Sequence, residues 1–209
     1  MKKLLLTVAC LALVACGRKA APPSTATAGT TPESYRVRFE TSKGPFTVAV
    51  TRSLSPRGAD RFYELVTSNY FNDVRFFRVV PGFVAQFGMN GDPKLNEEWA
   101  DKPIPDDSVK ETNARGTLVF ATSGPNSRSN QLFINLADNG RLDKMGFSPF
   151  GKVVDGMAVV DSLYSGYGES PSQQLITVHG NAYLTRNFPK LDYIKSAAIV
   201  PATDTGTAK

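Results

Sequence analysis

The sequence predicts an all-β fold: a closed eight-stranded antiparallel barrel capped by two helices, with a further helix at the C-terminal end. Three observations predict it. Eight short segments alternate or run apolar as strands do, and Gly, Pro, Ser and Asn turns separate them. Two other segments repeat apolar residues at helical spacing. Eight short antiparallel strands suffice to close a barrel whose interior is filled by its own side chains.

The first elements are a hairpin and a helix. Tyr35–Phe39 and Phe46–Val50 alternate apolar and polar residues on either side of a turn at Ser42-Lys43-Gly44, which predicts two paired strands. Ser55 before Pro56 is typical of a helix start, and apolar residues then recur at helical spacing. We expect this helix to plug one end of the barrel.

The remaining elements follow the same patterns. The six further predicted strands are Val74–Val80, Phe83–Gly88, Gly116–Ala121, Gln131–Leu136, Pro149–Val154 and Gln174–Val178. Asp155 can cap the second helix. Apolar residues near helical spacing within Asn187–Ser196 predict the C-terminal helix, packed on the barrel.

Length and composition indicate one globular domain between two tails. The 209 residues are 41% hydrophobic, which suits a single core over residues 34–196. Residues 197–209 are predicted to be a disordered tail. Lys and Arg number 24 against 19 Asp and Glu. This excess is too mild and too dispersed to predict nucleic acid as a partner, and we expect a monomer.

The N-terminus predicts export and a lipid anchor. Lys2 and Lys3 precede the apolar run Leu4–Val14, which is too short to span a bilayer and is typical of a secretory signal. The run ends in LVACG, which resembles the cleavage box of bacterial lipoproteins. That resemblance implies a signal peptide over residues 1–15 and a lipid on Cys16. The alternative is an ordinary secretory signal cut nearby.

The segment that begins at Cys16 has the composition of a flexible linker. Residues 16–33 are rich in Ala, Pro, Ser, Thr and Gly, cannot bury a core, and should form a flexible linker. Gly17, in place of Asp, resembles the sorting pattern for the outer membrane, so we expect an exported protein anchored to a bacterial membrane and facing the periplasm. Because both cysteines, Cys10 and Cys16, lie at or before the predicted anchor, the mature domain would contain no disulfide.

Two polar residues stand out in the apolar stretch Val74–Met89. Arg78 and Gln86 lie on strands that meet at Pro81-Gly82, and folding needs neither of them. Burying a charge is costly unless it is paired, so these residues either face water or do chemistry. A strand arginine commonly points its head to solvent, and the alternation along the strand does not decide between the two.

Asn90–Ala114 is predicted to be a long solvated loop, because it is polar and rich in Pro and Asp. Carboxylates are scattered along it, among them Asp92, Glu97, Glu98, Asp106 and Asp107. They show no ligand-like repeat, so no metal ion is expected. Trp99, the only tryptophan, should pin the loop to the domain.

Three ordered blocks carry a family resemblance. Phe76–Gln86 reads FFRVVPGFVAQ, Gly116–Asn135 follows as a second block, and Leu142–Val160 as a third. Together they resemble the signatures of the cyclophilins, the peptidyl-prolyl cis-trans isomerases, the first of which is written F-H-R-V-I-P-G-F-M-x-Q. Three blocks in order, within Tyr35 to Gly180, are far more specific than one short motif. The resemblance implies a cyclophilin-like barrel with its substrate groove on the outer face.

The resemblance also implies roles for individual residues, position by position. Arg78 would be catalytic together with Gln86, with the guanidinium aimed at the prolyl nitrogen. The implied substrate-binding residues are Phe83, Val84, Thr122, Gln131, Phe133, Leu142 and Phe147. The family needs no metal and no cofactor. Between Leu142-Asp143 and Phe150-Gly151 the chain has one residue more than the family pattern, so the pattern does not fix Phe147 as the pocket residue.

Five positions depart from the family pattern. Phe77 stands for histidine, Val84 for methionine, Thr122 for asparagine, Leu132 for phenylalanine and Arg141 for tryptophan. The arginine, phenylalanine and glutamine of the first signature are present. We therefore expect a prolyl isomerase that acts on proline-containing polypeptides and assists their folding.

Two other functions stay open at this point. A non-catalytic proline-peptide-binding or chaperone module would keep the pocket without turnover. A small-molecule-binding barrel of the lipocalin type would have an open interior, which a filled core would exclude.

Overall fold

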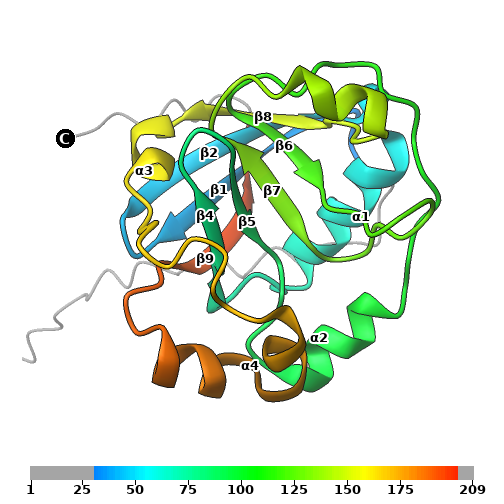
Figure 1. Ribbon diagram of the computed structural model, residues 1–209. Helices are drawn as coiled ribbons and strands as arrows, with labels where there is room; N and C mark the ends of the chain where they lie inside the picture. The colour runs from blue at the N-terminus through cyan, green and yellow to red at the C-terminus, as the bar shows by residue number, and fades with distance from the viewer. Residues whose placement is uncertain (1–30, 202–209) are drawn as a thin grey trace, which may run out of the picture. The chain divides into compact units, whose positions relative to one another are not determined.

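The computed structural model describes residues 31–201. The predicted signal peptide, the anchor Cys16, most of the predicted linker and residues 202–209 lie outside the described residues. The strands are β1 (Ser34–Thr41), β2 (Gly44–Thr51), β3 (Val74–Arg75), β4 (Arg78–Val80), β5 (Val84–Phe87), β6 (Thr117–Phe120), β7 (Leu132–Asn135), β8 (Gly151–Asp155) and β9 (Tyr193–Val200). They form one antiparallel sheet in the order β3-β9-β1-β2-β8-β6-β7-β5-β4 (Figure 1).

Helices and short 3₁₀ segments connect the strands. They are η1 (Arg52–Leu54), α1 (Pro56–Thr67), α2 (Pro93–Ala100), η2 (Gly140–Met145), α3 (Met157–Asp161) and α4 (Gln173–Asn187). Figure 1 shows α2 and α4 side by side, below the sheet in that view. Within residues 31–201, every helix is too short or too polar to cross a bilayer.

The sheet curls strongly around an aromatic core. Phe39 on β1 and Phe87 on β5 are five strands apart in the sheet order, yet their ring centroids lie 6.1 Å apart. Phe62 of α1 covers the core and packs on Phe39 and Phe150, with ring centroids 6.2 and 5.4 Å away. The interior is therefore filled by side chains, which excludes the lipocalin-type alternative.

The closed eight-stranded barrel is not confirmed. The predicted strand Val74–Val80 is divided at Phe76 and Phe77 into β3 and β4, which lie at opposite ends of the sheet order. Within the described residues no ladder joins β3 to β4. The curled sheet is thus an open half-barrel of nine strands, although only two residues of chain separate its outermost strands.

The C-terminal elements are exchanged relative to the prediction. The predicted strand Gln174–Val178 lies within α4, and the predicted helix Asn187–Ser196 does not form: its span holds the last residue of α4, a connecting segment and the start of β9. β9 pairs with β1 from Arg36↔Val200 to Thr41↔Ile194, so the ordered chain extends beyond the expected end at residue 196. Without β9, the edge of β1 would expose a row of unpaired backbone N–H and C=O groups. Pairing with β9 supplies their hydrogen-bond partners.

The stretch Asn90–Ala114 is more ordered than a solvated loop. It contains α2, which Asp92 caps by accepting from the Lys94 amide at 2.9 Å, with Pro93 in the first turn. Trp99 does pin this segment, because it packs on the main core and on Tyr70 at 5.8 Å between ring centroids. The sequence carried the signal for the helix, an Asp-Pro start, and the prediction did not use it.

Candidate functional site

The register of the sheet aligns the predicted site residues on its outer face. Arg78 of β4 lies opposite Gln86 of β5, and Gln86 lies opposite Phe133 of β7, which in turn lies opposite Val119 of β6. Because side chains alternate across a strand, these residues point away from the aromatic core. The hairpin turn is closed by the Phe83 amide, which donates to the Val80 carbonyl at 3.0 Å.

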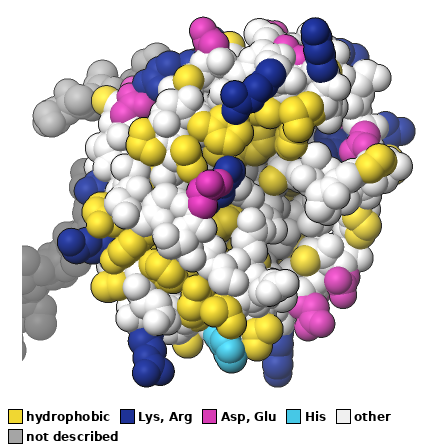
Figure 2. Space-filling view, in the orientation of Figure 1, with side chains coloured by type: hydrophobic (Ala, Val, Ile, Leu, Met, Phe, Trp, Pro, Cys, Tyr) yellow, Lys and Arg dark blue, Asp and Glu magenta, His cyan; other side chains and the backbone are white. Residues whose placement is uncertain are grey.

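An apolar cavity of about 380 Å³ opens on this face. A small cluster of side chains separate from the main core, Val84, Val119, Phe133 and Leu142, forms its base, and Phe83 and Phe147 pack against that cluster. The Phe133 and Phe147 rings meet edge to face at 5.6 Å. Figure 2 shows hydrophobic side chains gathered around a hollow on this face.

A chain of polar contacts crosses the cavity wall. Arg78 Nη1 donates to Gln86 Oε1 at 3.2 Å, and Gln86 Nε2 donates to Gln131 Oε1 at 2.9 Å. Gln86 is buried, and the Arg78 guanidinium lies 5.4 Å from the centre of the Phe83 ring. The arginine head is therefore held at the rim of an apolar cavity by a buried amide.

Every predicted site residue that the structure describes lies at this outer face of the sheet. Arg78, Phe83, Val84, Gln86, Thr122, Phe133, Leu142 and Phe147 line the cavity. Gln131 lines a second hollow of about 520 Å³, which shares Gln86 and Thr122 with the first. The Thr122 hydroxyl is engaged locally with Gly124 and Ser127.

Asp143 fastens the segment that carries Leu142 and Phe147. Its carboxylate accepts from Thr112 Oγ1 at 2.7 Å and from the Asn113 amide and Nδ2 at 2.9 and 2.7 Å. Burial alone would raise the pKa of Asp143, but these hydrogen bonds outweigh it and lower the pKa below that of a free aspartate. Asn113 Nδ2 also donates to the Phe147 carbonyl at 2.9 Å, which places Phe147 in the cavity.

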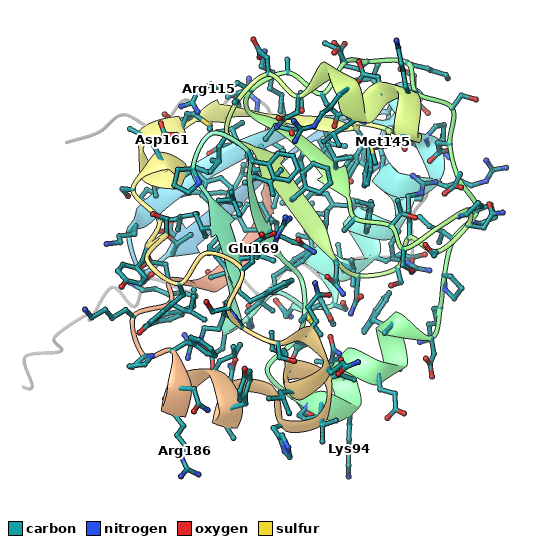
Figure 3. The ribbon with its side chains drawn as sticks, in the orientation of Figure 1. Lys94, Arg115, Met145, Asp161, Glu169 and Arg186 are labelled. Atoms are coloured by element: carbon teal, nitrogen blue, oxygen red, sulfur yellow. The ribbon has the colours of Figure 1, made fainter. Side chains whose placement is uncertain are left out.

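Sequence reasoning missed Ala121, which directly follows β6, and two further residues of the cavity, Glu169 and Gln173. These two belong to the segment between α3 and β9, which was predicted to hold a strand instead of α4. Glu169 pairs with Arg78: Arg78 Nε donates to Glu169 Oε1 at 2.6 Å, and Nη2 also contacts this oxygen. Figure 3 labels Glu169 in front of β4 and β5. Nothing in the local sequence indicated this contact, because the two residues are 91 positions apart.

The same segment explains one departure from the family pattern. Phe77 is 1% exposed and belongs to a second apolar cluster with Met89, Ile176, Leu184 and Leu191. Ile176 and Leu184 lie on α4, so this helix covers the position where the family has histidine. An apolar ring is favoured there because a buried imidazole needs hydrogen-bond partners.

Within residues 31–201, no group of three or more His, Cys, Asp or Glu side chains is placed to hold a metal ion. The polar groups around the cavity are instead one guanidinium, one carboxylate, hydroxyls and amides.

Known proteins resemble this chain in sequence and in fold. The sequence model of the family "Cyclophilin type peptidyl-prolyl cis-trans isomerase/CLD" matches residues 36–180. A peptidyl-prolyl cis-trans isomerase of Acinetobacter baylyi is 35% identical over 133 residues, which are 61% of this chain and 70% of that protein. Peptidyl-prolyl cis-trans isomerase A of Dickeya dadantii is 37% identical over 136 residues, covering 62% of this chain and 71% of its own length.

Solved structures share the fold. A cyclophilin type peptidyl-prolyl cis-trans isomerase of Cryptosporidium parvum is 24% identical and superposes with a TM-score of 0.57, covering 80% of this chain and 98% of its own. A second structure of that protein was determined in the presence of the dipeptide Ala-Pro. It is 23% identical, with a TM-score of 0.57 and coverage of 79% of this chain and 99% of its own.

Proposed function

This chain belongs to the cyclophilin-type peptidyl-prolyl cis-trans isomerase family, and we propose that it accelerates rotation about X-Pro bonds in polypeptides. The observation that carries the proposal is the position of Arg78, beside the Phe83 ring in a cavity with apolar walls that is large enough to admit a proline ring. Gln86, Gln131 and the backbone at Thr122 would bind the substrate's carbonyl and main chain. No metal or cofactor is needed for this reaction.

The chemistry requires only that the twisted amide be favoured over the planar one. The X-Pro bond has partial double-bond character, so its uncatalysed cis-trans isomerisation takes tens of seconds, across a barrier of about 20 kcal/mol. In the twisted form the prolyl nitrogen becomes pyramidal and exposes its lone pair. A donor aimed at that lone pair binds the transition state better than either planar ground state. A guanidinium suits this task because it stays charged and holds its donors in a rigid fork.

Magnitudes show that the arginine does not act alone. A charge-assisted hydrogen bond contributes about 1.5–3 kcal/mol, and each tenfold in rate requires about 1.36 kcal/mol. Arg78 thus accounts for a rate increase of roughly ten- to a hundredfold. The apolar walls, Phe83, Phe133 and Leu142, would supply more, since a dry environment strengthens the contact. The combination of Arg78, Gln86 and this cavity favours catalysis over the non-catalytic binding module.

The test is isomerisation of a proline peptide, followed by exchange NMR, with the domain of residues 31–201. Arg78→Ala should lower kcat/KM by about 10²–10³, more than the bare hydrogen bond accounts for, because the dry walls strengthen the contact that is lost. The matched control is Arg115→Ala, because Arg115 also pairs with a carboxylate, Asp161 at 2.6 Å, away from the cavity. Wild-type rates equal to buffer would overturn the proposal, and peptide binding without turnover would favour the binding module.

We further propose that the chain is exported and acts as a lipid-anchored monomer at a bacterial outer membrane, facing the periplasm. The proposal is supported by the apolar run Leu4–Val14 and by the LVACG box around Cys16. The linker of residues 16–33 would give the isomerase domain reach above the membrane.

Cysteine substitutions test the anchor. Cys16→Ser should abolish acylation and shift the protein from the membrane to the soluble fraction, whereas the matched Cys10→Ser should do neither. Mass spectrometry of the mature N-terminus checks the lipid, and density separation of the membranes checks the location. An unmodified N-terminus in the soluble wild type would support the ordinary secretory signal instead.

A further inference from the structure

The ion pair between Glu169 and Arg78 is not used by the proposed chemistry. Arg78 Nε donates to Glu169 Oε1 at 2.6 Å, and Nη2 contacts the same oxygen. The Arg78 side chain is 24% exposed and that of Glu169 is 64% exposed, so the carboxylate covers the guanidinium from the solvent side. In Figure 2 an acidic side chain adjoins a basic one at the centre of the face where Figure 3 labels Glu169.

The carboxylate is presented by a structured loop. Tyr167 packs edge to face on Tyr164 and on Phe188, with ring centroids 5.0 and 5.1 Å apart. The Ser170 amide donates to the Tyr167 carbonyl at 2.9 Å, and the Gly168 amide donates to the Ser165 carbonyl at 2.9 Å. The residues on both sides of Glu169 in the sequence are therefore held by contacts, and these hold the Glu169 side chain over Arg78.

The end of this loop is fastened as well. The Ser172 hydroxyl accepts from the Leu175 amide at the start of α4, and the Ser172 amide donates to the Tyr183 hydroxyl at 3.1 Å. α4 itself is kinked at Gly180, whose φ of +53° and close approach to the Gly91 carbonyl leave no room for a side chain. The kink lets α4 lie against α2 and still hold the loop over β4 and β5.

The charges of the cavity make Glu169 distinctive. Among the described residues that line the two hollows, Glu169 is the only acidic side chain and Arg78 the only basic one. Glu169 holds Nε and one side of Nη2, while Gln86 takes only one of the two Nη1 hydrogens, so a peptide that approaches Arg78 from the solvent side displaces Glu169. Exposed ion pairs are weak enough to be displaced, and the displaced carboxylate would then lack a counter-ion.

We propose that Glu169 is a specificity-determining residue of this site, which favours a cationic side chain next to the substrate proline and disfavours an anionic one. The inference rests on the proposed isomerase function. A lysine or arginine beside the proline replaces Arg78 as the partner of the displaced carboxylate. A glutamate or aspartate at that place meets a like charge and competes with Glu169 for Arg78.

The experiment compares proline peptides that carry Lys, Gln or Glu on either side of the proline. Exchange NMR measures kcat/KM at low ionic strength, where the interaction of exposed charges is least screened. For the wild type we expect the Lys peptide to exceed the Glu peptide by about fivefold, the upper range for an exposed ion pair. Glu169→Gln should bring this ratio close to one, and Glu169→Lys should invert it.

Asp161→Asn is the matched control. It removes one negative charge and breaks an exposed pair with Arg115 at 2.6 Å, which Figure 3 shows away from Glu169. This variant should keep the wild-type ratio. Because Glu169 is exposed, its substitution should not affect folding, which thermal unfolding checks.

Two failures can be told apart. Equal Lys-to-Glu ratios in the wild type and in Glu169→Gln, with turnover intact, would overturn this inference and leave the isomerase function in place. Absence of turnover with every peptide would overturn the proposed function and this inference with it.

Discussion

The Arg78 guanidinium donates to two partners, one on the other strand of its own hairpin and one far along the chain. Nη1 binds Gln86, eight positions away, and Nε binds Glu169, 91 positions away. The sequence left open whether this arginine faces water or does chemistry. The sheet register places the Arg78↔Gln86 pair on the outer face beside the cavity, which favours the proposed chemical role.

Phe77 shows how a single departure from a family pattern reflects a distant element. The side chain is 1% exposed and packs with residues of α4 and with Met89. The sequence shows only that phenylalanine replaces the histidine of the family pattern. The reason is the packing of α4 on Phe77, about a hundred residues further along the chain.

Phe77→His should therefore destabilise the domain. A buried imidazole without partners costs roughly 1–3 kcal/mol, and we expect a loss of this size in the free energy of unfolding. Denaturant unfolding of both proteins measures it. Val178→His is the matched control, because Val178 lies on α4 but is 63% exposed, and surface changes are usually within about 0.5 kcal/mol. Equal losses in the two variants would contradict burial of Phe77 under α4.

At the scale of elements, α1 is capped by a residue from a distant loop. Ser55 precedes the helix as predicted, but its hydroxyl makes no cap and donates instead to Asp107 Oδ2 at 2.7 Å. Asp107 accepts from the Gly58 and Arg57 amides at 3.0 and 3.3 Å. An aspartate at a helix N-terminus also complements the helix dipole. The prediction that Asp107 is a solvated loop residue is therefore wrong.

The same carboxylate forms a buried ion pair. Asp107 Oδ2 lies 3.1 Å from Arg128 Nη2, and the two side chains are 4% and 3% exposed. Burial would raise the pKa of Asp107, but the bonds from Ser55, Gly58 and Arg57 and the charge of Arg128 outweigh it, so the pKa is lowered. Because the unfolded chain takes up this proton more readily, the stabilisation is complete above about pH 4 and is lost as the pH falls through the folded-state pKa.

Asp107→Asn should lower the free energy of unfolding by about 3–5 kcal/mol at pH 7, since it leaves Arg128 buried without its main partner. The difference from the wild type should be smaller at pH 3, below the ordinary pKa of an aspartate, because the unfolded wild-type chain then binds a proton that the folded protein, with its lowered pKa, resists. Denaturant unfolding at both pH values measures this. The control is Asp106→Asn, which also neighbours Arg128, at 3.4 Å, but is 41% exposed and should cost about 1 kcal/mol or less. A loss that does not depend on pH would contradict the role of the Asp107 charge.

At the scale of the whole domain, the hairpin at Tyr35–Val50 and the first helix were predicted correctly, because their burial follows local periodicity. The strands that carry the site were also found, with Val74–Val80 divided in two. The prediction failed beyond residue 173, where Ile176, Thr177 and Val178 favour a strand by propensity alone. Packing decides otherwise, because Ile176 before the kink at Gly180 and Leu184 after it are both buried in the cluster with Phe77, and the segment is helical.

The three motif blocks of the sequence were enough to indicate the family and the side chains of the cavity, Arg78, Gln86 and Phe133 among them. These features depend on residue type, on spacing and on alternation, which are local properties of a strand. Only the tertiary structure decided that β9 completes the edge of β1, that Asp107 caps α1, and that Glu169 covers Arg78. Each of these is a contact between groups far apart in sequence, and its formation depends on which backbone edges, helix ends and charges the rest of the fold leaves unsatisfied.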